Sequence, residues 1–373
     1  MKINYILSHP IQYQAPLIKF LSKKKIEIKV FYRSNISVMN RRYYDYGFKK
    51  KIKWNVSLLD GYKYYFLKKI GPNKVTSIFP ITIEFVSALK NCEYIWLHGL
   101  KNWYNLLIIF ISKIFQKKII IRDELHYNSK SRSKINLIFN KIFFKIINYF
   151  VYRFLYIGKA NKKFYLFNKI PKNKLIFIPY VVDNNFFFKR KIRVTKKIRF
   201  LVASKFIKRK GIDLLLQSIS ICNAYENFKE NTHFKIIGNG YEKEKLLRLK
   251  KKNKLTNVFF EDFKNQKEIK KEYFNNDILV MPSLYEPWGL VINEAMAAGN
   301  IIIASDLVGA SFDLVKNNFN GYKFKNGDKL DLAKKLKKIF ENKKKILRMK
   351  KNSQILISDW NFFKCYKNFM KLK

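Results

Sequence analysis

The sequence contains little acid: 26 Asp and Glu residues stand against 77 Lys and Arg residues, which gives a formal charge of +51. Only 12 of the 77 basic residues are Arg, the side chain suited to bidentate contacts with phosphates and bases. This shortage argues against sequence-specific recognition of nucleic acid. The charge predicts attraction to anionic membrane surfaces and to polyphosphates. The excess of Lys, Asn, Ile, Phe and Tyr is also typical of AT-rich coding.

Cysteine and long apolar runs are scarce as well. Cys92, Cys222 and Cys365 lie far apart with no CxxC pair, which argues against a disulfide framework and a zinc site and favours a reducing compartment. The longest apolar runs, within 105–111 and 135–158, fall short of the roughly 18 residues that a membrane span needs. The N-terminal residues hold too few apolar side chains for a signal-peptide core. We therefore expect a cytoplasmic protein without a transmembrane helix, able to bind the inner face of the plasma membrane peripherally.

The sequence does contain a regular alternation of strand-like and helix-like segments, which predicts α/β domains with parallel sheets. The length suits two domains, and the polar, basic stretch at 181–197 is expected to join them. We predict an N-terminal domain over 1–188, a second domain over 189–355 and a C-terminal helix over 356–373 that returns to the first domain. Strands are expected at 2–7, 26–32, 92–97, 118–122, 154–158, 175–180, 197–204, 233–238, 257–262, 277–283 and 300–305.

Ligands of open parallel sheets bind beyond the carboxyl ends of the strands, and the unusual side chains of the first half gather there. They include three of the four histidines in the chain. The residues that follow predicted strands are His9, Gln12, His98, Glu124 and His126. Two such edges that face each other would form a cleft.

A basic loop follows the strand predicted at 197–204 and leads into a helix. Its basic residues are Lys205, Lys208, Arg209 and Lys210. Such a loop suits a diphosphate, because free amides and the helix dipole add to the side-chain charge, although a lysine-rich chain also produces basic loops without a ligand. Gly238 and Gly240 in the next turn let a ligand approach the backbone closely, but ordinary tight turns use glycine too.

The most specific pattern is the stretch MPSLYEPWGLVINEAMAAG, which places Glu286 and Glu294 eight positions apart. Gly289 lies where helix amides are still free, and Leu290 and Glu294 are one turn apart on the same helix face. Carboxylates so placed can accept hydrogen bonds from vicinal hydroxyls while the amides hold phosphate oxygens, which describes a nucleotide-sugar. The structural alternative is that both glutamates cap the helix and pair with lysines, although Glu294 lies too deep in the helix to cap it.

Residues 197 to about 340 resemble the retaining glycosyltransferases of family 4, whose GT-B fold has two Rossmann-like, doubly wound parallel-sheet domains facing a cleft. The E-x7-E pattern of that family stands here as Glu286 and Glu294, and its cationic pair resembles Lys205 and Lys210. The resemblance implies transfer of a sugar from a nucleoside-diphosphate sugar to an acceptor hydroxyl with retention of configuration. It also implies that Glu294 holds the ribose and Glu286 the donor sugar.

The resemblance implies a set of site residues. The expected donor-binding residues are Lys205, Lys210, Gly238, Gly240, Phe263, Trp288, Gly289, Leu290 and Glu294. The expected catalytic residues are Glu286 and either Glu124 or His126, while His9, Gln12 and His98 are acceptor-side candidates. No DxD sequence occurs, so neither a metal nor another cofactor is expected. The first loop, SHPIQYQAP, departs from the family because it lacks paired glycines.

Residues 135–156 interleave Lys with Phe, Tyr and Ile. Such a surface suits an anionic bilayer and favours a lipid-linked or cell-surface glycan as the acceptor; a core helix with exposed lysines is the alternative. Two other functions stay open. One is a GT-B sugar epimerase or phosphorylase. The other is a basic nucleic-acid-binding protein, which would give no role to Glu286, Glu294 or Gly289; no specific nucleic acid is expected as a partner.

Overall fold

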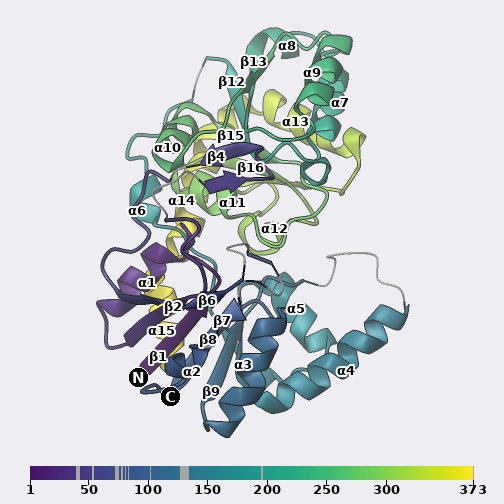
Figure 1. Ribbon diagram of the computed structural model, residues 1–373. Helices are drawn as coiled ribbons and strands as arrows, with labels where there is room; N and C mark the ends of the chain where they lie inside the picture. Colours follow the sequence, from purple (N-terminus) through teal and green to yellow (C-terminus); the bar gives the residue numbers. More distant parts are fainter. Residues whose placement is uncertain are drawn as a thin grey trace. The chain divides into compact units, whose positions relative to one another are not determined.

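A computed structural model describes residues 1–38, 43–52, 54–71, 75–76, 79, 81–82, 84–100, 102–126, 134–194 and 196–372. The chain divides into two compact units. The first contains Met1–Tyr43, Val56–Val182 and Phe362–Lys373, and the second contains Tyr44–Asn55 and Asp183–Asn361. The short segment Tyr44–Asn55 therefore lies in the second unit although its neighbours in sequence lie in the first. Figure 1 shows its strand β4 (Lys50–Ile52), in purple, among the green elements of that unit.

The first unit is built on a seven-stranded parallel sheet with the order β11-β10-β9-β8-β1-β2-β5. Its central strands are runs of apolar and β-branched side chains buried on both faces, as expected for a parallel sheet covered by helices. Tyr5 and Trp96 stack across two neighbouring strands with ring centroids 3.7 Å apart. The strands are β1 (Lys2–Leu7), β2 (Glu27–Tyr32), β5 (Lys63–Phe66), β8 (Tyr94–His98), β9 (Lys118–Arg122), β10 (Val151–Tyr156) and β11 (Leu175–Phe177).

Helices cover this sheet, and the last of them comes from the end of the chain. The helices are α1 (Ala15–Ser22), α2 (Phe85–Ala88), α3 (Trp103–Ile114), α4 (Lys134–Phe150), α5 (Lys159–Phe167) and α15 (Phe362–Phe369). In α15, the Cys365 Sγ lies 3.4 Å from the Pro179 carbonyl oxygen, and Phe369 packs against Trp96. The yellow α15 accordingly lies among the purple elements near the N-terminus in Figure 1. A small antiparallel pair, β6 (Lys69–Ile70) and β7 (Ile81–Thr82), also belongs to this unit.

The second unit has a six-stranded parallel sheet with the order β14-β13-β12-β15-β16-β17. Phe200 and Phe234 stack in its core with centroids 4.4 Å apart. The strands are β12 (Ile198–Ala203), β13 (Thr232–Ile237), β14 (Val258–Glu261), β15 (Ile278–Met281), β16 (Ile301–Ser305) and β17 (Gly321–Phe324). The helices are α6 (Asn184–Phe187), α7 (Ile212–Cys222), α8 (Phe228–Asn231), α9 (Lys243–Lys252), α10 (Gln266–Asn275), α11 (Leu290–Ala297), α12 (Ser311–Leu314), α13 (Lys329–Glu341) and α14 (Ile346–Ser358).

Both sheets are doubly wound and have one topological switch point each. In the first unit the chain reverses its direction of travel between β1 and β8, and in the second between β12 and β15. In folds of this kind, ligands bind outside the carboxyl ends of the two strands at the switch point. The topology therefore selects, in each unit, the loops in which functional side chains should be sought.

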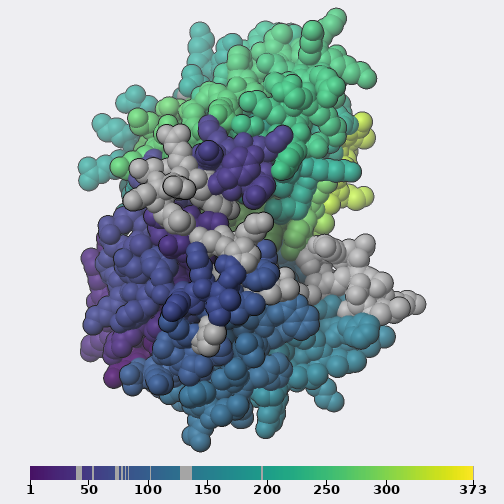
Figure 2. Space-filling model, in the orientation of Figure 1, coloured from purple at the N-terminus to yellow at the C-terminus, as the bar shows by residue number. Residues whose placement is uncertain are grey.

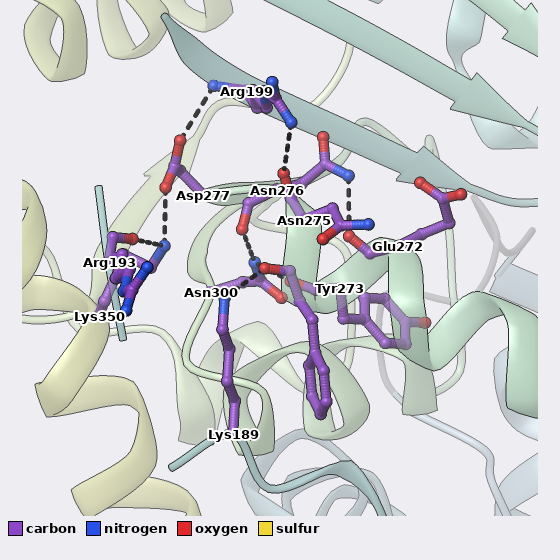
Figure 3. Close-up of polar contacts among 11 residues, drawn as sticks. Lys189, Arg193, Arg199, Glu272, Tyr273, Asn275, Asn276, Asp277, Asn300 and Lys350 are labelled. Carbon is purple, nitrogen blue, oxygen red and sulfur yellow. Dashed lines mark hydrogen bonds and ion pairs between the residues drawn. The ribbon is translucent and has the colours of Figure 1, made fainter. Parts of the chain in front are cut away.

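A buried polar network fixes the connecting segment and α14 to the second sheet (Figure 3). The Lys350 ammonium lies 2.7 Å from Asp277 Oδ1 and donates to the Arg193 carbonyl at 2.8 Å. Asp277 Oδ2 accepts a hydrogen bond from the Arg199 amide at 3.1 Å, and Asn300 Nδ2 donates to the carbonyls of Tyr273 and Asn276. This network lies at the amino ends of the strands, away from the switch-point loops, and its role is structural.

Three local features differ from the sequence analysis. Residues 135–156 were expected to form one basic, aromatic surface, with a strand only from residue 154, but α4 ends at Phe150 and β10 already begins at Val151. The stretch 181–197, expected only to join the two domains, contains the single helical turn α6, capped where the Asp183 side chain accepts a hydrogen bond from the Phe186 amide. The edge strand β5 was not predicted, since all four of its side chains are exposed and carry no apolar pattern.

Candidate active site

The loop between β12 and α7 carries the cations that the sequence analysis singled out. Lys210 ends a single turn of 3-10 helix, Lys208–Lys210, and its side chain is only 13% exposed. Burial lowers the pKa of Lys210, Glu286 opposes that shift, and the neighbouring charges of Arg209 and Lys205 lower the pKa further. The ammonium therefore lies in a confined cationic group beyond the end of β12.

The loop between β15 and α11 lies directly against this cationic group. Glu286 Oε2 is 2.5 Å from Lys210 Nζ and 3.1 Å from Arg209 Nη1. The backbones are joined too, because the Leu284 amide donates to the Arg209 carbonyl and Arg209 Nη1 donates to the Tyr285 carbonyl. The two loops of the switch point thus form one ion-paired unit around Glu286.

Helix α11 begins directly after this loop. Gly289 precedes its first residue, Leu290, and has φ +97°, a conformation that glycine adopts without strain. A Cβ at Gly289 would lie 2.8 Å from the Met281 Cε atom, so a side chain there would also have to displace the end of the Met281 side chain. Trp288 is 3% exposed and its Nε1 donates to Asn293 Oδ1 at 2.9 Å. Trp288 therefore anchors the turn from inside and does not present its ring to a ligand.

Glu294, one turn into α11, has a different environment from Glu286. Its Oε2 accepts a hydrogen bond from the Tyr273 hydroxyl at 2.8 Å. Burial raises the pKa of Glu294 to about 7, although the hydrogen bond from Tyr273 works in the opposite direction. The carboxyl group is therefore poised to change its charge near neutral pH.

The turn after β13 contains Gly238 and Gly240 and packs on the loop after β12. The Phe206 amide donates to the Asn239 carbonyl at 2.8 Å. Gly240 has φ +152°, and a Cβ there would lie 2.5 Å from the Phe206 carbonyl oxygen and 2.9 Å from the Gly47 carbonyl oxygen. Only glycine allows these backbones to come so close. Phe263, after β14, packs against Phe48 with centroids 4.7 Å apart.

Lys205 has a partner that the sequence analysis missed. Its ammonium lies 2.8 and 2.9 Å from the two carboxylate oxygens of Asp45. Asp45 belongs to β3 (Tyr43–Asp45), which pairs with β4 to form a hairpin in the second unit. The turn residues Asp45 and Gly47 were a signal for a hairpin, but nothing in the local sequence indicates that the hairpin packs on a loop 160 residues away.

In the first unit, the switch-point loops hold a cluster around Glu124. Glu124 Oε1 accepts hydrogen bonds from the hydroxyls of Tyr180 at 2.5 Å and Tyr13 at 3.2 Å, and lies 3.7 Å from His98 Nε2. Burial alone would raise the pKa of Glu124, but the nearby His98 ring and the hydrogen bonds from Tyr180 and Tyr13 outweigh it and hold the pKa below its usual value. Glu124 is therefore a carboxylate at neutral pH.

A cavity of about 270 Å³ lies beside this cluster in the first unit. Its wall includes His98, the last residue of β8, and Ser8, Arg33 and Asp123, which follow β1, β2 and β9. The cavity therefore opens at the carboxyl ends of the strands around the first switch point. The Asp123 carboxylate accepts from the Leu100 and Leu125 amides at 2.5 and 3.0 Å and thereby shapes the wall.

The remaining first-unit candidates are placed less favourably for chemistry. His126 is 1% exposed. His9 Nδ1 is 2.9 Å from the Ser8 hydroxyl, and burial lowers the pKa of His9 to about 4, which keeps the ring neutral. Gln12 has a buried side-chain oxygen without a hydrogen-bond partner among the described residues. Of the first-domain candidates, the structure brings His98 and Glu124 together.

The chain is similar in sequence to known glycosyltransferases. Residues 183–355 match the sequence model described as glycosyl transferases group 1. An uncharacterized glycosyltransferase of Methanocaldococcus jannaschii is 30% identical over 154 residues, 38% of this chain and 37% of that protein. The N,N'-diacetylbacillosaminyl-diphospho-undecaprenol alpha-1,3-N-acetylgalactosaminyltransferase of Campylobacter jejuni is 21% identical over 378 residues, 95% of this chain and 93% of that protein.

The fold of the complete chain is similar to that of a solved structure. The crystal structure of Anabaena HepE in complex with UDP and glucose superposes with a TM-score of 0.73 at 15% identity, covering 100% of this chain and 98% of that one. The sequence matches are shorter: the chain spans 37% of the Methanocaldococcus protein named above, and 46% and 27% of two further relatives.

Proposed function

Because residues 183–355 match the family model of glycosyl transferases group 1 and the chain has the GT-B fold, we propose that this protein is a retaining glycosyltransferase that uses a nucleoside-diphosphate sugar. The observation that carries the proposal is the meeting of Lys210, Arg209 and Glu286 at the switch point of the second sheet, where such folds bind their ligands. The bound UDP and glucose in the Anabaena structure support this donor class.

The donor diphosphate would be held by Lys205, Lys210 and the first amides of α11. As the bond to the sugar breaks, negative charge grows on the diphosphate and the sugar gains oxocarbenium character. Cations and amides that are already in place stabilise this charge without reorganisation, and we propose that they do so without a metal. Glu286 would contact the sugar and Glu294 the ribose hydroxyls.

In the first unit we propose Glu124, rather than His126, as the side chain that meets the reacting groups. The Glu124 side chain is 33% exposed and ionised, whereas His126 is 1% exposed. Hydrogen bonds from Tyr13 and Tyr180 fix the orientation of the carboxylate. A carboxylate held in this way can stabilise a sugar that becomes positively charged in the transition state.

The proposal is tested by titration with UDP and, separately, GDP, followed by turnover with the corresponding sugar nucleotides. Lys210→Ala is expected to weaken binding at least about ten-fold, because a confined cation is lost. Glu286→Gln should bind the nucleoside diphosphate as well as or better than the wild type, since Lys210 is released. The same variant should lose roughly 100-fold in turnover, because its contact with the sugar is gone.

Lys208→Ala is the matched control for Lys210→Ala, because it removes a charge from the same loop. It should keep wild-type binding. Equal affinity of wild type and Lys210→Ala for both nucleotides would contradict the proposed donor site. The configuration of the new bond, read from the anomeric coupling in proton NMR, tests retention separately.

We propose a lipid-linked glycan as the acceptor and an anionic bilayer as the surface on which it is met. The Campylobacter relative acts, by its name, on an undecaprenol-linked diphosphate sugar. On α3 the exposed apolar residues recur at helical spacing, and α4 repeats the pattern beside it. The exposed residues of these two helices are Trp103, Leu107, Phe110, Ile114, Ile138, Phe139, Ile142, Ile146 and Tyr149.

The charge of these two helices fits an anionic surface. Neither α3 nor α4 contains an acidic residue, whereas both contain lysine. In addition, Lys113 lies 5.2 Å above the Tyr149 ring and links the two helices. Among the described residues no helix is long and apolar enough to cross a bilayer. An apolar face bordered by lysines is the pattern of helices that lie in the membrane interface.

Flotation with vesicles that contain phosphatidylglycerol tests the membrane surface. Wild type should float with these vesicles at low salt and much less with neutral phosphatidylcholine vesicles. Phe139→Asp, which changes a side chain that is 67% exposed, should stay at the bottom. Ile355→Asp is the matched control, because Ile355 is 64% exposed on the second unit. Equal flotation of both variants would contradict the assignment of the surface.

A further inference from the structure

The hairpin β3–β4 covers the part of the second unit that the donor would occupy. Figure 2 shows purple atoms of this early segment on the surface of the green second unit. The contact with Lys205 is bidentate, and the Asp45 side chain is only 14% exposed. The Asp45 carboxylate is ion-paired with the Lys205 ammonium and therefore takes the position that an oxygen of a bound diphosphate would need.

Other contacts hold the hairpin over the same region. The Phe48 ring lies 4.8 Å below the Lys205 ammonium and 4.7 Å from the Phe263 ring. Lys50 Nζ is 2.5 Å from Asp262 Oδ2, and the Gly47 carbonyl approaches the Gly240 turn. The hairpin therefore contacts the proposed phosphate cation Lys205, the glycine turn and Phe263, the aromatic side chain expected to bind the donor.

We infer that Asp45 is an internal competitor of the donor and that the β3–β4 hairpin leaves Lys205 when a nucleoside diphosphate binds. This inference rests on the proposed function, because it takes Lys205 to be a phosphate cation. A diphosphate carries more negative charge than one carboxylate and can also reach Lys210 and the α11 amides. It therefore displaces Asp45, whereas a ligand with a single weak charge does not. In this way Asp45 makes the site selective for diphosphates.

The apparent affinity for the donor depends on how often Lys205 is free of Asp45. If only a fraction of molecules has a free Lys205, the apparent affinity for the donor falls by that fraction. Asp45→Asn removes the competing charge but keeps an oxygen that can accept the hydrogen bond from the Phe48 amide, which is 3.0 Å from Asp45 Oδ1. The turn of the hairpin should therefore survive the substitution while its attraction to Lys205 is lost.

The first experiment measures UDP and GDP binding by calorimetry to wild type, Asp45→Asn and Asp359→Asn. Asp359→Asn is the matched control, because it removes one exposed aspartate of the same unit and changes the net charge equally. Asp45→Asn should bind the nucleoside diphosphate about ten-fold more tightly than the wild type, and Asp359→Asn should bind like the wild type. Unchanged or weaker binding by Asp45→Asn would overturn the inference.

The second experiment follows hydrogen exchange of the hairpin amides in residues 44–52. Saturating nucleotide should speed their exchange in the wild type, because the hairpin is displaced. Slower exchange would mean that the hairpin closes over the ligand, and would overturn the inference while leaving the proposed function intact. Failure of wild type and Asp45→Asn alike to bind either nucleotide would instead overturn the proposed function on which the inference rests.

Discussion

At the scale of single residues, the two glutamates of the E-x7-E pattern have opposite electrostatic surroundings. Glu286 lies between two cations, whereas Glu294 accepts a hydrogen bond from a tyrosine hydroxyl and has a raised pKa. The structural alternative of a lysine partner thus applies to Glu286, whereas Glu294 pairs with no lysine among the described residues. The sequence could not distinguish the surroundings of the two glutamates, because Tyr273 lies in α10, which precedes β15 and is separated from Glu294 by that strand and a loop.

The raised pKa of Glu294 predicts how stability depends on pH. In the unfolded chain the carboxyl group ionises near its usual pKa of 4.5, but in the folded protein it keeps its proton up to about pH 7. Between these values the folded state binds the proton more strongly, so the free energy of unfolding falls as pH rises. The gap corresponds to at most about 3 kcal/mol.

Urea unfolding at pH 5 and pH 7.5 measures this effect. Glu294→Gln cannot ionise, so its free energy of unfolding should fall less between the two pH values than that of the wild type. All other titrating groups are shared by the two proteins and cancel in the difference. An identical fall in both proteins would show that Glu294 does not titrate in this range.

At the scale of elements, the buried strands could be predicted and the exposed ones could not. Strands such as β1, β9 and β16 are short apolar runs with β-branched residues, which is the pattern of a strand covered on both faces. Strand β5 and the β3–β4 hairpin carry little apolar pattern, because they lie at an edge or on a surface. The local sequence pattern predicts which faces of a strand are buried, but it does not predict which distant loop a hairpin contacts.

The attachment of α14 to the second sheet depends on one buried ion pair. The side chains of Lys350 and Asp277 are 3% and 1% exposed. Lys350→Met leaves the Asp277 charge buried without its cation, and such a loss typically costs about 3–5 kcal/mol. We therefore expect a marked fall in the denaturation midpoint, measured by chemical unfolding.

A surface pair provides the comparison for this element. Lys337 and Glu341 are 3.6 Å apart on α13 with side chains 35% and 53% exposed, and Lys337 Nζ lies 3.7 Å from the centre of the Tyr225 ring. Lys337→Met should therefore cost no more than about 1.5 kcal/mol. The double variant Asp277→Asn with Lys350→Met should recover part of the stability, because no buried charge remains. A single variant Lys350→Met as stable as Lys337→Met would contradict a structural role for the pair.

At the scale of the whole molecule, the fold and the general position of the site followed from the sequence because both depend on regular patterns. Alternating strands and helices predicted the two parallel sheets, and the ends of their strands predicted where Glu286 and Glu124 would lie. The partners of Lys205 and Glu294 depend on contacts between distant segments. They are set by packing, which no local pattern encodes.

The net charge of +51 makes one further prediction for the molecule as a whole. A chain with so many lysines will bind DNA at low salt through phosphate contacts, and this binding weakens steeply as salt rises because counterions are released. A nucleoside diphosphate carries only a few charges and is held by a confined site, so its binding should fall far less. DNA binding is measured by fluorescence anisotropy with a labelled duplex of about 30 base pairs, and nucleotide binding by calorimetry with UDP or GDP, both between about 50 and 400 mM NaCl. The comparison is between the slopes of log affinity against log salt concentration for the two ligands. Sequence-selective DNA binding that persists at the highest salt, together with absent nucleotide binding, would favour the nucleic-acid alternative, because only specific base contacts resist salt in that way.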